Sequence, residues 1–340
     1  ITFFETAYKY CREYLLKNFY IKSIVINLQE FEKVGSGQII IKILKSKCSN
    51  KTTRIFDKKT NKTLYIEQKK WINKNDEFKI RYSFSKEKDK IIDKINKKNF
   101  RTLKELYPRK NLRTCVMPLN MENQFLTKKP SGIYEFFPYY KGSKSLKYKY
   151  DKLNFDFLFE YNKPLQDKIN NELKIQLQEL GIKNKKRIGL GEPIIYRNPK
   201  VYIRQSAKEL IASYDENSSA GNNSLYVFSL RNNNYESRLF LKYLTGILNS
   251  ELYTFFAQRT GIIRYIKGKQ PQIKISDLYK IPISTDSKLI SVIAEQVDRI
   301  ILKNEIQDSS SKINNFIYEE FNIKDSEKNI ITKSISNYLK

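Results

Sequence analysis

The sequence predicts a mixed α/β fold, and three observations along the chain support that prediction. Near the start, a helical pattern is followed by two almost continuously apolar runs, Ile21–Leu28 and Gln38–Leu44, which are typical of strands. From Phe100 to about Ser284, short strand-like runs are mixed with two long helical patterns. After Pro282 only helical patterns remain. We therefore expect part of a sheet, a mixed α+β domain and a helical tail.

The first segment reads as a helix followed by two strands. Phe3 to Asn18 carries its apolar side chains on one stripe, and a glycine turn at Gly35–Gly37 separates the two apolar runs. Strands of near-continuous apolar character are typical of the centre of a sheet covered on both faces. Three elements are too few for such a sheet. We therefore expect its other strands to lie upstream of Ile1, in a longer reading frame.

The segment that follows is polar and rich in lysine, and we interpret it as a transition between domains. It holds a predicted strand at Lys62–Gln68 and a predicted helix at Lys86–Lys97. The resulting division has four parts: residues 1–48, the end of one domain; 49–98, the transition; 99–284, the middle domain; and 285–340, the helical tail.

The middle domain and the tail are predicted from periodicity and from Pro and Gly at helix ends. Proline opens one helical pattern at Pro164 and glycine closes it at Gly181. The predicted strands are Ile133–Phe137, Leu146–Tyr150, Phe155–Phe159, Val201–Arg204 and Leu225–Leu230. The predicted helices are Pro164–Leu180, Glu236–Gln258, Leu289–Lys303, Ile313–Phe321 and Ser326–Leu339.

Charge and composition point to a polyanionic partner. The net charge is +28, and not one of the 340 residues is histidine, which removes the commonest general base and metal ligand. Residues 1–50 carry 8 basic and 4 acidic side chains and residues 281–340 carry 8 and 9, so +25 of the charge falls between them. A basic surface concentrated in one region is typical of nucleic-acid binding. The alternative is a surface of solvated lysines.

Other classes of function have weaker support. The three cysteines, Cys11, Cys48 and Cys115, are too few and too scattered for a disulfide framework or a zinc site, and we expect buried free thiols in a reducing cytoplasm. No apolar run approaches the length of a membrane span. A loose likeness to a Pro-Asp…Glu-x-Lys nuclease site, at Pro164, Asp167, Glu172 and Lys174, lies on one helix, whereas such a site needs ligands on strands. We interpret it as surface charge.

Three groups of basic, amide and aromatic side chains are candidates for DNA contact. One ends the predicted strand at Arg204, a second forms a loop after the long helix, and a third surrounds the strand at Leu146–Tyr150. Arg and Gln suit paired hydrogen bonds to guanine and adenine edges, and basic glycine-bearing loops can follow a phosphate backbone. The candidates are Lys200, Arg204 and Gln205; Arg259, Arg264, Tyr265, Lys267, Lys269 and Gln270; and Lys141, Lys147 and Lys149. For any one of them, a solvated lysine or a core tyrosine is the alternative.

Several of these segments together resemble a known family, the C-terminal specificity region of Taq-type adenine DNA methyltransferases and of fused type IIG restriction–modification enzymes. The similar segments are Tyr196–Lys200 running into Arg204-Gln205, Leu244–Leu252 (LTGILNSEL), Ile273–Leu278 (IKISDL), Ile281-Pro282-Ile283, and Ile313–Phe321 with Glu327. Residues 3–44 resemble the last helix and two strands of the methyltransferase domain, which would make them the C-terminal remnant of a Rossmann-like sheet.

The resemblance implies a function that this chain performs only in part. The family methylates adenine N6 in duplex DNA, with S-adenosylmethionine as donor and the target base flipped out of the stack. Its glycine-rich cofactor motif and its Asn-Pro-Pro-Tyr/Phe motif are absent from the sequence. We therefore expect no catalytic, cofactor-binding or metal-binding residue in this chain. The expected partners are double-stranded DNA and the missing N-terminal catalytic half, in the cytoplasm. A separate specificity subunit of a type I-like system and a general nucleic-acid-binding protein remain alternatives.

Overall fold

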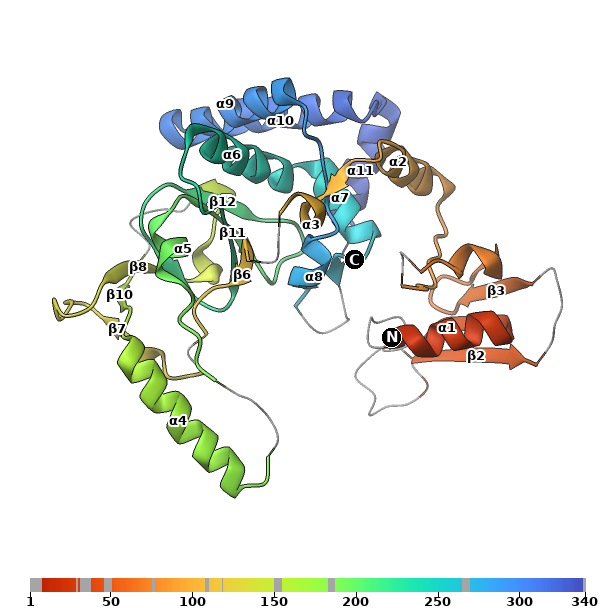
Figure 1. The fold of residues 1–340 in the computed structure, drawn as a ribbon. Coiled ribbons are helices and arrows are strands. Elements are labelled where there is room, and N and C mark those ends of the chain that lie inside the picture. Colours follow the sequence, from red (N-terminus) through yellow and green to blue (C-terminus); the bar gives the residue numbers. More distant parts are fainter. Residues whose placement is uncertain are drawn as a thin grey trace. The chain divides into compact units, whose positions relative to one another are not determined.

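The computed structural model describes residues 8–28, 30, 38–45, 51–74, 77–107, 110–117, 119–149, 155–182, 187–264 and 270–338. The chain forms two compact units, one reaching Lys90 and one comprising most of the chain from Ile91 onward. Each unit has its own hydrophobic core. Helices and small mixed sheets alternate along the chain, as Figure 1 shows, so the predicted mixed α/β class is confirmed.

The first unit is a helix packed on a four-stranded sheet. The strands lie in the order β2-β1-β3-β4, with β1 and β3 parallel and the two outer pairs antiparallel. Its elements are α1 (Lys9–Asn18), β1 (Tyr20–Leu28), β2 (Gln38–Leu44), β3 (Thr52–Asp57), β4 (Lys62–Glu67) and the short 3-10 helix η3 (Gln68–Trp71). The predicted strands at Ile21, Gln38 and Lys62 are therefore present.

This sheet differs from the predicted one in two respects. Strand β2 lies at the edge of the described sheet and exposes Ile40 and Leu44, so its apolar run does not mark a central strand. Strand β3 was not predicted, because its sequence, TTRIFD, has few apolar residues. Its inward positions include polar Thr53, whose hydroxyl donates to the Ile21 carbonyl at 2.6 Å. Two of the four strands thus come from the segment interpreted as a transition.

The second unit contains the remaining elements, except that α2 begins before the boundary at Lys90. Its helices are α2 (Lys86–Lys97), α3 (Leu103–Leu106), α4 (Lys163–Glu179), α5 (Pro193–Arg197), α6 (Tyr235–Asn249), α7 (Glu251–Arg259), α8 (Ile275–Leu278), α9 (Ser287–Lys303), α10 (Ile306–Glu320) and α11 (Asp325–Ser336). Its strands are β5 (Arg101–Thr102), β6 (Leu112–Thr114), β7 (Leu126–Thr127), β8 (Phe136–Tyr140), β9 (Tyr148–Lys149), β10 (Phe157–Glu160), β11 (Lys200–Arg204), β12 (Ala212–Asp215), β13 (Ala220–Gly221), β14 (Leu225–Ser229), β15 (Ile263–Arg264), β16 (Gln272–Ile273) and β17 (Pro282–Ile283).

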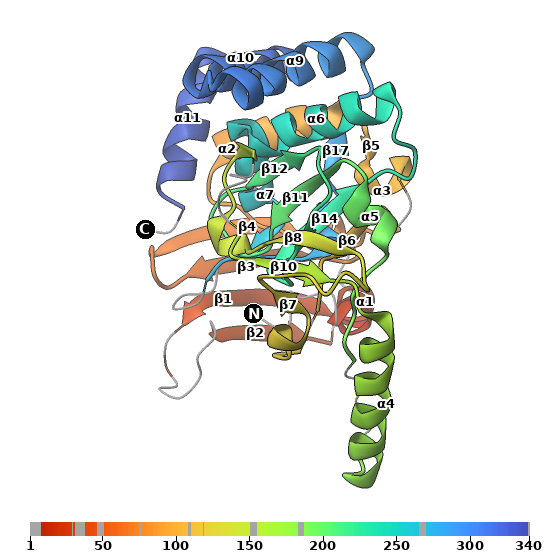
Figure 2. The same ribbon diagram turned by 90° about the vertical axis from the view of Figure 1, so that its left-hand side faces the viewer.

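The centre of the second unit is a five-stranded sheet in the order β6-β14-β11-β12-β9, covered on both faces. Side chains alternate along its strands, so Val201 and Ile203 enter the core shared with the helices, whereas Tyr202 enters the core of a second sheet. That second sheet has the order β13-β8-β10-β7. Figure 2 shows the resulting layers, from α9 and α10 through α6 and the central sheet to β8 and β10.

The predicted long helix at Glu236–Gln258 is two helices, and the break occurs at Asn249-Ser250. Ser250 ends α6 in an extended conformation and caps α7, its side chain accepting from the Tyr253 N–H. The buried Asn249 side chain donates to the Ala212 carbonyl at 2.7 Å and accepts from the Ala212 N–H at 3.0 Å. The apolar periodicity continues without interruption through Asn249-Ser250, so it could not predict the break between the two helices.

The other predicted helices are present with shifted ends. The tail helices α9, α10 and α11 pack beside α6 and α7, and α10 begins seven residues earlier than the periodicity indicated because Ile306–Lys312 is polar. Helix α4 agrees closely with its prediction. It projects from the domain in both views, and Ile169 is its only fully buried residue.

The Asn249 contact gives a test of the packing between α6 and β12. Asn249→Ala leaves the N–H and carbonyl of the fully buried Ala212 without their side-chain partner, so we expect a loss of about 2–4 kcal/mol in the free energy of unfolding. Urea unfolding measures it. The exposed Asn232→Ala is the matched control and should change the value by less than about 0.5 kcal/mol. A loss below about 1 kcal/mol for Asn249→Ala would contradict this account.

Candidate nucleic-acid interface

The end of strand β11 brings Arg204 and Gln205 to the surface. The strand is buried along its length, and its burial decreases only at Arg204, which pairs with Leu225 of β14. Arg204 lies on the same face of the strand as Tyr202, because side chains alternate. Both Arg204 and Gln205 are partly exposed. The predicted basic and amide groups therefore lie where a covered sheet opens to solvent.

The loop predicted after the long helix lies beside this strand end. Strands β15 and β16 pair antiparallel, Ile263 with Ile273 and Arg264 with Gln272. The Ile273 N–H donates to the Gln205 carbonyl at 2.9 Å, and the Ser206 hydroxyl donates to the Pro271 carbonyl at 2.9 Å. Two of the three predicted groups are thus joined by hydrogen bonds.

The third predicted group, around Lys141–Lys149, lies next to the same strand end, because Gly142 and Gln205 both contact Ser224. The Gln205 N–H donates to the Ser224 carbonyl at 3.0 Å. On the other side, the Gly142 N–H lies 3.2 Å from the Ser224 hydroxyl and 3.1 Å from the Asn222 side-chain oxygen. A side chain at Gly142 would collide with Ser224, so a glycine is required for this approach. We call residues 141–147, 204–206, 222–224 and 270–274 the strand-end surface.

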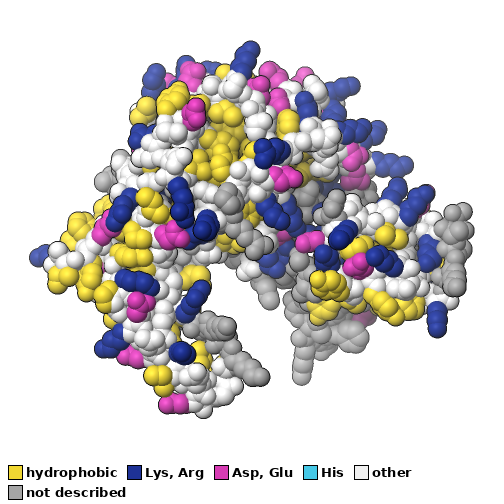
Figure 3. Space-filling model, in the orientation of Figure 1, with side chains coloured by type: hydrophobic (Ala, Val, Ile, Leu, Met, Phe, Trp, Pro, Cys, Tyr) yellow, Lys and Arg dark blue, Asp and Glu magenta, His cyan; other side chains and the backbone are white. Residues whose placement is uncertain are grey.

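The basic residues of this region differ in whether they form ion pairs. Arg264 is bound to the buried carboxylate of Asp277, which Lys280 also approaches at 3.3 Å. Lys147 pairs with Glu209 at 2.7 Å. Arg204 has no ion pair or side-chain hydrogen bond with any described residue, so its five N–H donors are available. Figure 3 shows Lys and Arg side chains dispersed over one face with acidic side chains between them, so local pairing decides which cations can bind a ligand.

The remaining members of the third group have different surroundings. The Lys141 ammonium lies 5.7 Å from the centre of the Phe157 ring, a favourable cation–π distance. Lys149 donates to the side-chain oxygen of Asn304 at the end of α9, so it contacts the helical tail. Within the predicted strand Leu146–Tyr150, Leu146 is exposed while Tyr148 is buried.

Lys200 was predicted to contact DNA, and that prediction is wrong. The residue is fully buried, because β11 is covered on both faces. Its ammonium donates to the Asn217 carbonyl at 2.6 Å and lies 3.5 Å from the Ser219 hydroxyl. Burial lowers the pKa of Lys200 to about 8, and the nearby carboxylate of Asp215 opposes this shift. Lys200 therefore fixes the turn after β12 and takes no part in a surface.

Other predicted residues have mixed outcomes. Arg259 is partly buried at the end of α7, and Gln270 is exposed just before β16. Tyr265, Lys267 and Lys269 lie outside the described residues, as does Cys48. Cys115 is a buried free thiol as predicted, whereas Cys11 is exposed, because α1 turns it away from the core.

The C-terminal tail contacts strand β15 of the β15–β16 pair. The Tyr338 hydroxyl donates to the Ile263 carbonyl at 2.8 Å. The strand-end surface also includes Asn222 and Ser224, which were not among the predicted site residues. Their Asn-Asn-Ser composition signals a turn but not the segments that the turn contacts.

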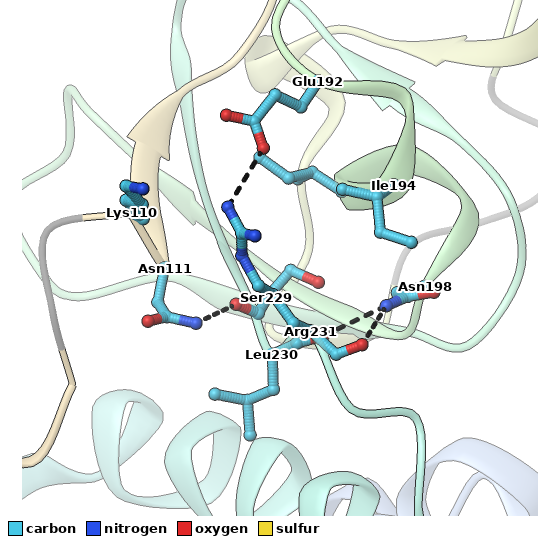
Figure 4. Close-up of a pocket in the computed structure, with 9 residues that line it drawn as sticks. Lys110, Asn111, Glu192, Ile194, Asn198, Ser229, Leu230 and Arg231 are labelled. Atoms are coloured by element: carbon cyan, nitrogen blue, oxygen red, sulfur yellow. Dashed lines mark hydrogen bonds and ion pairs between the residues drawn. The ribbon is translucent and has the colours of Figure 1, made fainter.

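A small pocket lies at the other end of the central strands, where β14 ends at Ser229 (Figure 4). Its polar groups are already engaged with one another. Glu192 pairs with Arg113 at 2.8 Å and Arg231 at 3.5 Å, and the Asn198 amide donates to two backbone carbonyls at 3.1 Å. These groups are therefore engaged in contacts between α5 and the sheet.

The described residues contain neither a candidate metal site nor a candidate membrane span. No cluster of His, Cys, Asp or Glu there could hold a metal ion. Asp167, a member of the loose nuclease likeness, pairs with Lys163 one turn earlier on α4, at 2.8 Å. No described helix is long and apolar enough to cross a membrane.

Comparison with known proteins places the second unit. Residues 138–283 match the TaqI-like C-terminal specificity domain. The chain therefore contains a specificity domain of this type, and the resemblance predicted from the sequence is confirmed. The match includes β11, β14, the α6–α7 pair and the β15–β16 pair, and all of the strand-end surface. No curated protein matches the sequence.

Two solved structures are similar over nearly the whole chain. One is the type IIL restriction–modification enzyme MmeI in complex with DNA, with 11% identity, 94% of this chain covered and a TM-score of 0.48. The other is the type IIG restriction endonuclease BpuSI, with 12% identity, 93% of this chain covered and a TM-score of 0.37. The match covers 46% of each of those chains, so this chain spans about half of their length.

The lowered pKa of Lys200 predicts a distinctive pH dependence of stability. The folded value is about 8, whereas an unfolded lysine titrates near pH 10.4, so between these values the unfolded chain binds more protons and stability rises with pH. Relative to Lys200→Met, the free energy of unfolding of the parent should rise by about 2 kcal/mol from pH 7 to pH 10. Denaturant unfolding at several pH values measures the difference. The exposed Lys208→Met controls for loss of one charge, and parallel curves for parent and Lys200→Met would contradict the prediction.

Proposed function

We propose that this protein recognises a specific sequence in double-stranded DNA through the strand-end surface. The observation that carries the proposal is the match of residues 138–283 to a TaqI-like specificity domain. The net charge of +28 provides attraction to a polyanion. Arg204 has no side-chain partner among the described residues, so its donors suit a guanine edge. The loop sequence that contains Lys267 and Lys269 is basic and glycine-bearing, which suits the phosphate backbone.

We further propose that this recognition serves an adenine-N6 DNA methyltransferase of a restriction–modification system. The support is the family resemblance of the sequence, including the LTGILNSEL segment, whose Asn and Ser set the α6–α7 break. Such an enzyme uses S-adenosylmethionine as its methyl donor. In this proposal the cofactor and catalytic residues lie outside these 340 residues, in a catalytic half that acts with this chain.

The described residues do not fit S-adenosylmethionine. The sequence Gly189-Leu190-Gly191 is not placed between a long strand and a helix, as a cofactor-binding turn requires. The space beside Gly191 is filled by the Tyr196 hydroxyl, which donates to the Leu190 carbonyl at 2.7 Å. We therefore derive no catalytic step from this chain.

The proposed docking surface predicts two different kinds of defect. Arg204→Ala should relax sequence preference, because a base contact is lost. Lys267→Ala should weaken binding to all duplexes alike and lower the slope of log affinity against log salt by about 1, because a phosphate contact is lost. Equilibrium binding to a selected duplex and to unrelated duplexes, at several salt concentrations, measures both effects.

Two binding results would contradict this docking model or the proposal of sequence recognition. If both variants bind every duplex as tightly as the parent, neither Arg204 nor the 259–270 loop contacts DNA, and the docking model is wrong. If the parent itself binds all duplexes with equal affinity, the protein is a general nucleic-acid-binding protein and the sequence-recognition proposal fails.

The methyltransferase proposal has its own test. We expect DNA in frame upstream of the Ile1 codon to encode a glycine-rich cofactor motif followed by Asn-Pro-Pro-Tyr or Asn-Pro-Pro-Phe. Sequencing that DNA measures this directly, and a longer protein made from it should transfer a methyl group to adenine in duplex DNA. A start codon close upstream, without these motifs, would instead leave a separate DNA-reading subunit.

A further inference from the structure

Gln205 is held at three points, and its side-chain amide is one of them. Its backbone N–H donates to the Ser224 carbonyl at 3.0 Å, and its backbone carbonyl accepts from the Ile273 N–H at 2.9 Å. Its side-chain nitrogen Nε2 donates to the Leu225 carbonyl at 3.2 Å. A glutamine beside a solvent-facing strand end usually keeps its rotamer freedom, so this fixed geometry is informative about how it can bind.

The Leu225 carbonyl also fixes the orientation of the Gln205 side-chain amide, because it determines which end of the amide faces it. An amide has a donor end and an acceptor end, and turning it over exchanges them. In the reversed orientation, the side-chain oxygen Oε1 would face the lone pairs of the Leu225 carbonyl oxygen, which is already hydrogen-bonded to the Cys115 N–H at 3.2 Å. Leu225 is fully buried, so its carbonyl cannot turn away. The observed orientation is therefore the only one that this contact permits.

The fixed amide retains one acceptor and one donor. Oε1 receives no hydrogen bond from any described residue, and Nε2 has a second N–H besides the one given to Leu225. In the major groove, adenine presents the complementary pair, the N6 amino donor and the N7 acceptor. Guanine presents two acceptors there, O6 and N7, and thymine presents the O4 acceptor with a methyl group. Either of those bases could accept a hydrogen bond from Nε2, but neither offers a donor to the fixed Oε1, so only adenine matches both ends of the amide.

We propose that Gln205 is a fixed reader of one adenine in the recognition sequence, selected because the Leu225 carbonyl prevents the amide from reversing. This inference rests on the proposed function, since it assumes that the strand-end surface enters the major groove. It assigns different bases to neighbouring residues. The guanidinium of Arg204 has donors only, which suits guanine, whereas Gln205 rejects guanine at its own position.

The first experiment selects binding sequences from a library of randomised duplexes, using the parent, Gln205→Met and a control. Methionine has a similar length but cannot form the paired hydrogen bonds. We expect the parent to select a defined sequence, and Gln205→Met to lose the preference at a single position, where the parent selects adenine, while keeping the others. The matched control is Gln307→Met, at an exposed position on α10, and it should select the parental sequence throughout.

A second measurement uses the unaltered protein and so does not depend on how a variant folds. At the adenine position identified by selection, 7-deazaadenine removes the N7 acceptor and purine removes the N6 amino group. Each analogue should weaken binding of the parent by roughly tenfold. The same analogues should have little further effect on Gln205→Met, because the contact is already absent.

The outcomes separate this inference from the proposed function. A parent that selects no sequence contradicts the proposed function, and the Gln205 inference falls with it. A parent that selects a sequence, combined with an unchanged preference in Gln205→Met, overturns only the Gln205 assignment. The same holds if the affected position is guanine, thymine or cytosine, or if the parent binds the analogue duplexes as tightly as the natural one.

Discussion

Burial of the central sheet on both faces is the constraint on which the second unit depends. Strands β11 and β14 place alternate side chains into two separate cores, one against the helices and one against the β8–β10 sheet. Polar groups along β11 must therefore be satisfied internally, as Lys200 is by the Asn217 carbonyl. Only where the strand ends can a polar side chain reach solvent, and that restricts a binding surface built on β11 to Arg204 and the residues that follow it.

Backbone hydrogen bonds organise that surface more than side-chain charges do. Gln205 is bonded through its backbone to Ser224 and to Ile273, and Ser224 in turn lies against Gly142. Segments more than 50 residues apart are thereby held in one arrangement before any ligand binds. Pre-organised groups lose less conformational entropy on binding, and a fixed donor or acceptor can reject a wrong partner as well as accept a right one.

The Asn-Ser pair between α6 and α7 shows how a short sequence motif can be structural. Asn249 pairs with both backbone groups of Ala212, and Ser250 caps the next helix. Together they turn the helical chain and attach it to β12 of the central sheet, next to the strand that carries Arg204. The motif signalled the family from the sequence, but its physical role lies in chain direction and buried hydrogen bonding.

The sequence by itself determined the mixed α/β class, the strands at Val201 and Leu225, the helix at Pro164 and the specificity-domain resemblance, because apolar periodicity and Pro/Gly signals are local. Only the tertiary structure decided that Lys200 is buried, that Arg264 is neutralised by Asp277, that β3 joins the first sheet, and that Ser224 contacts both Gln205 and Gly142. Each of these depends on what covers a residue or pairs with it from a distant part of the chain. Composition and spacing describe a residue's neighbours in sequence, whereas burial and hydrogen bonding depend on its neighbours in space.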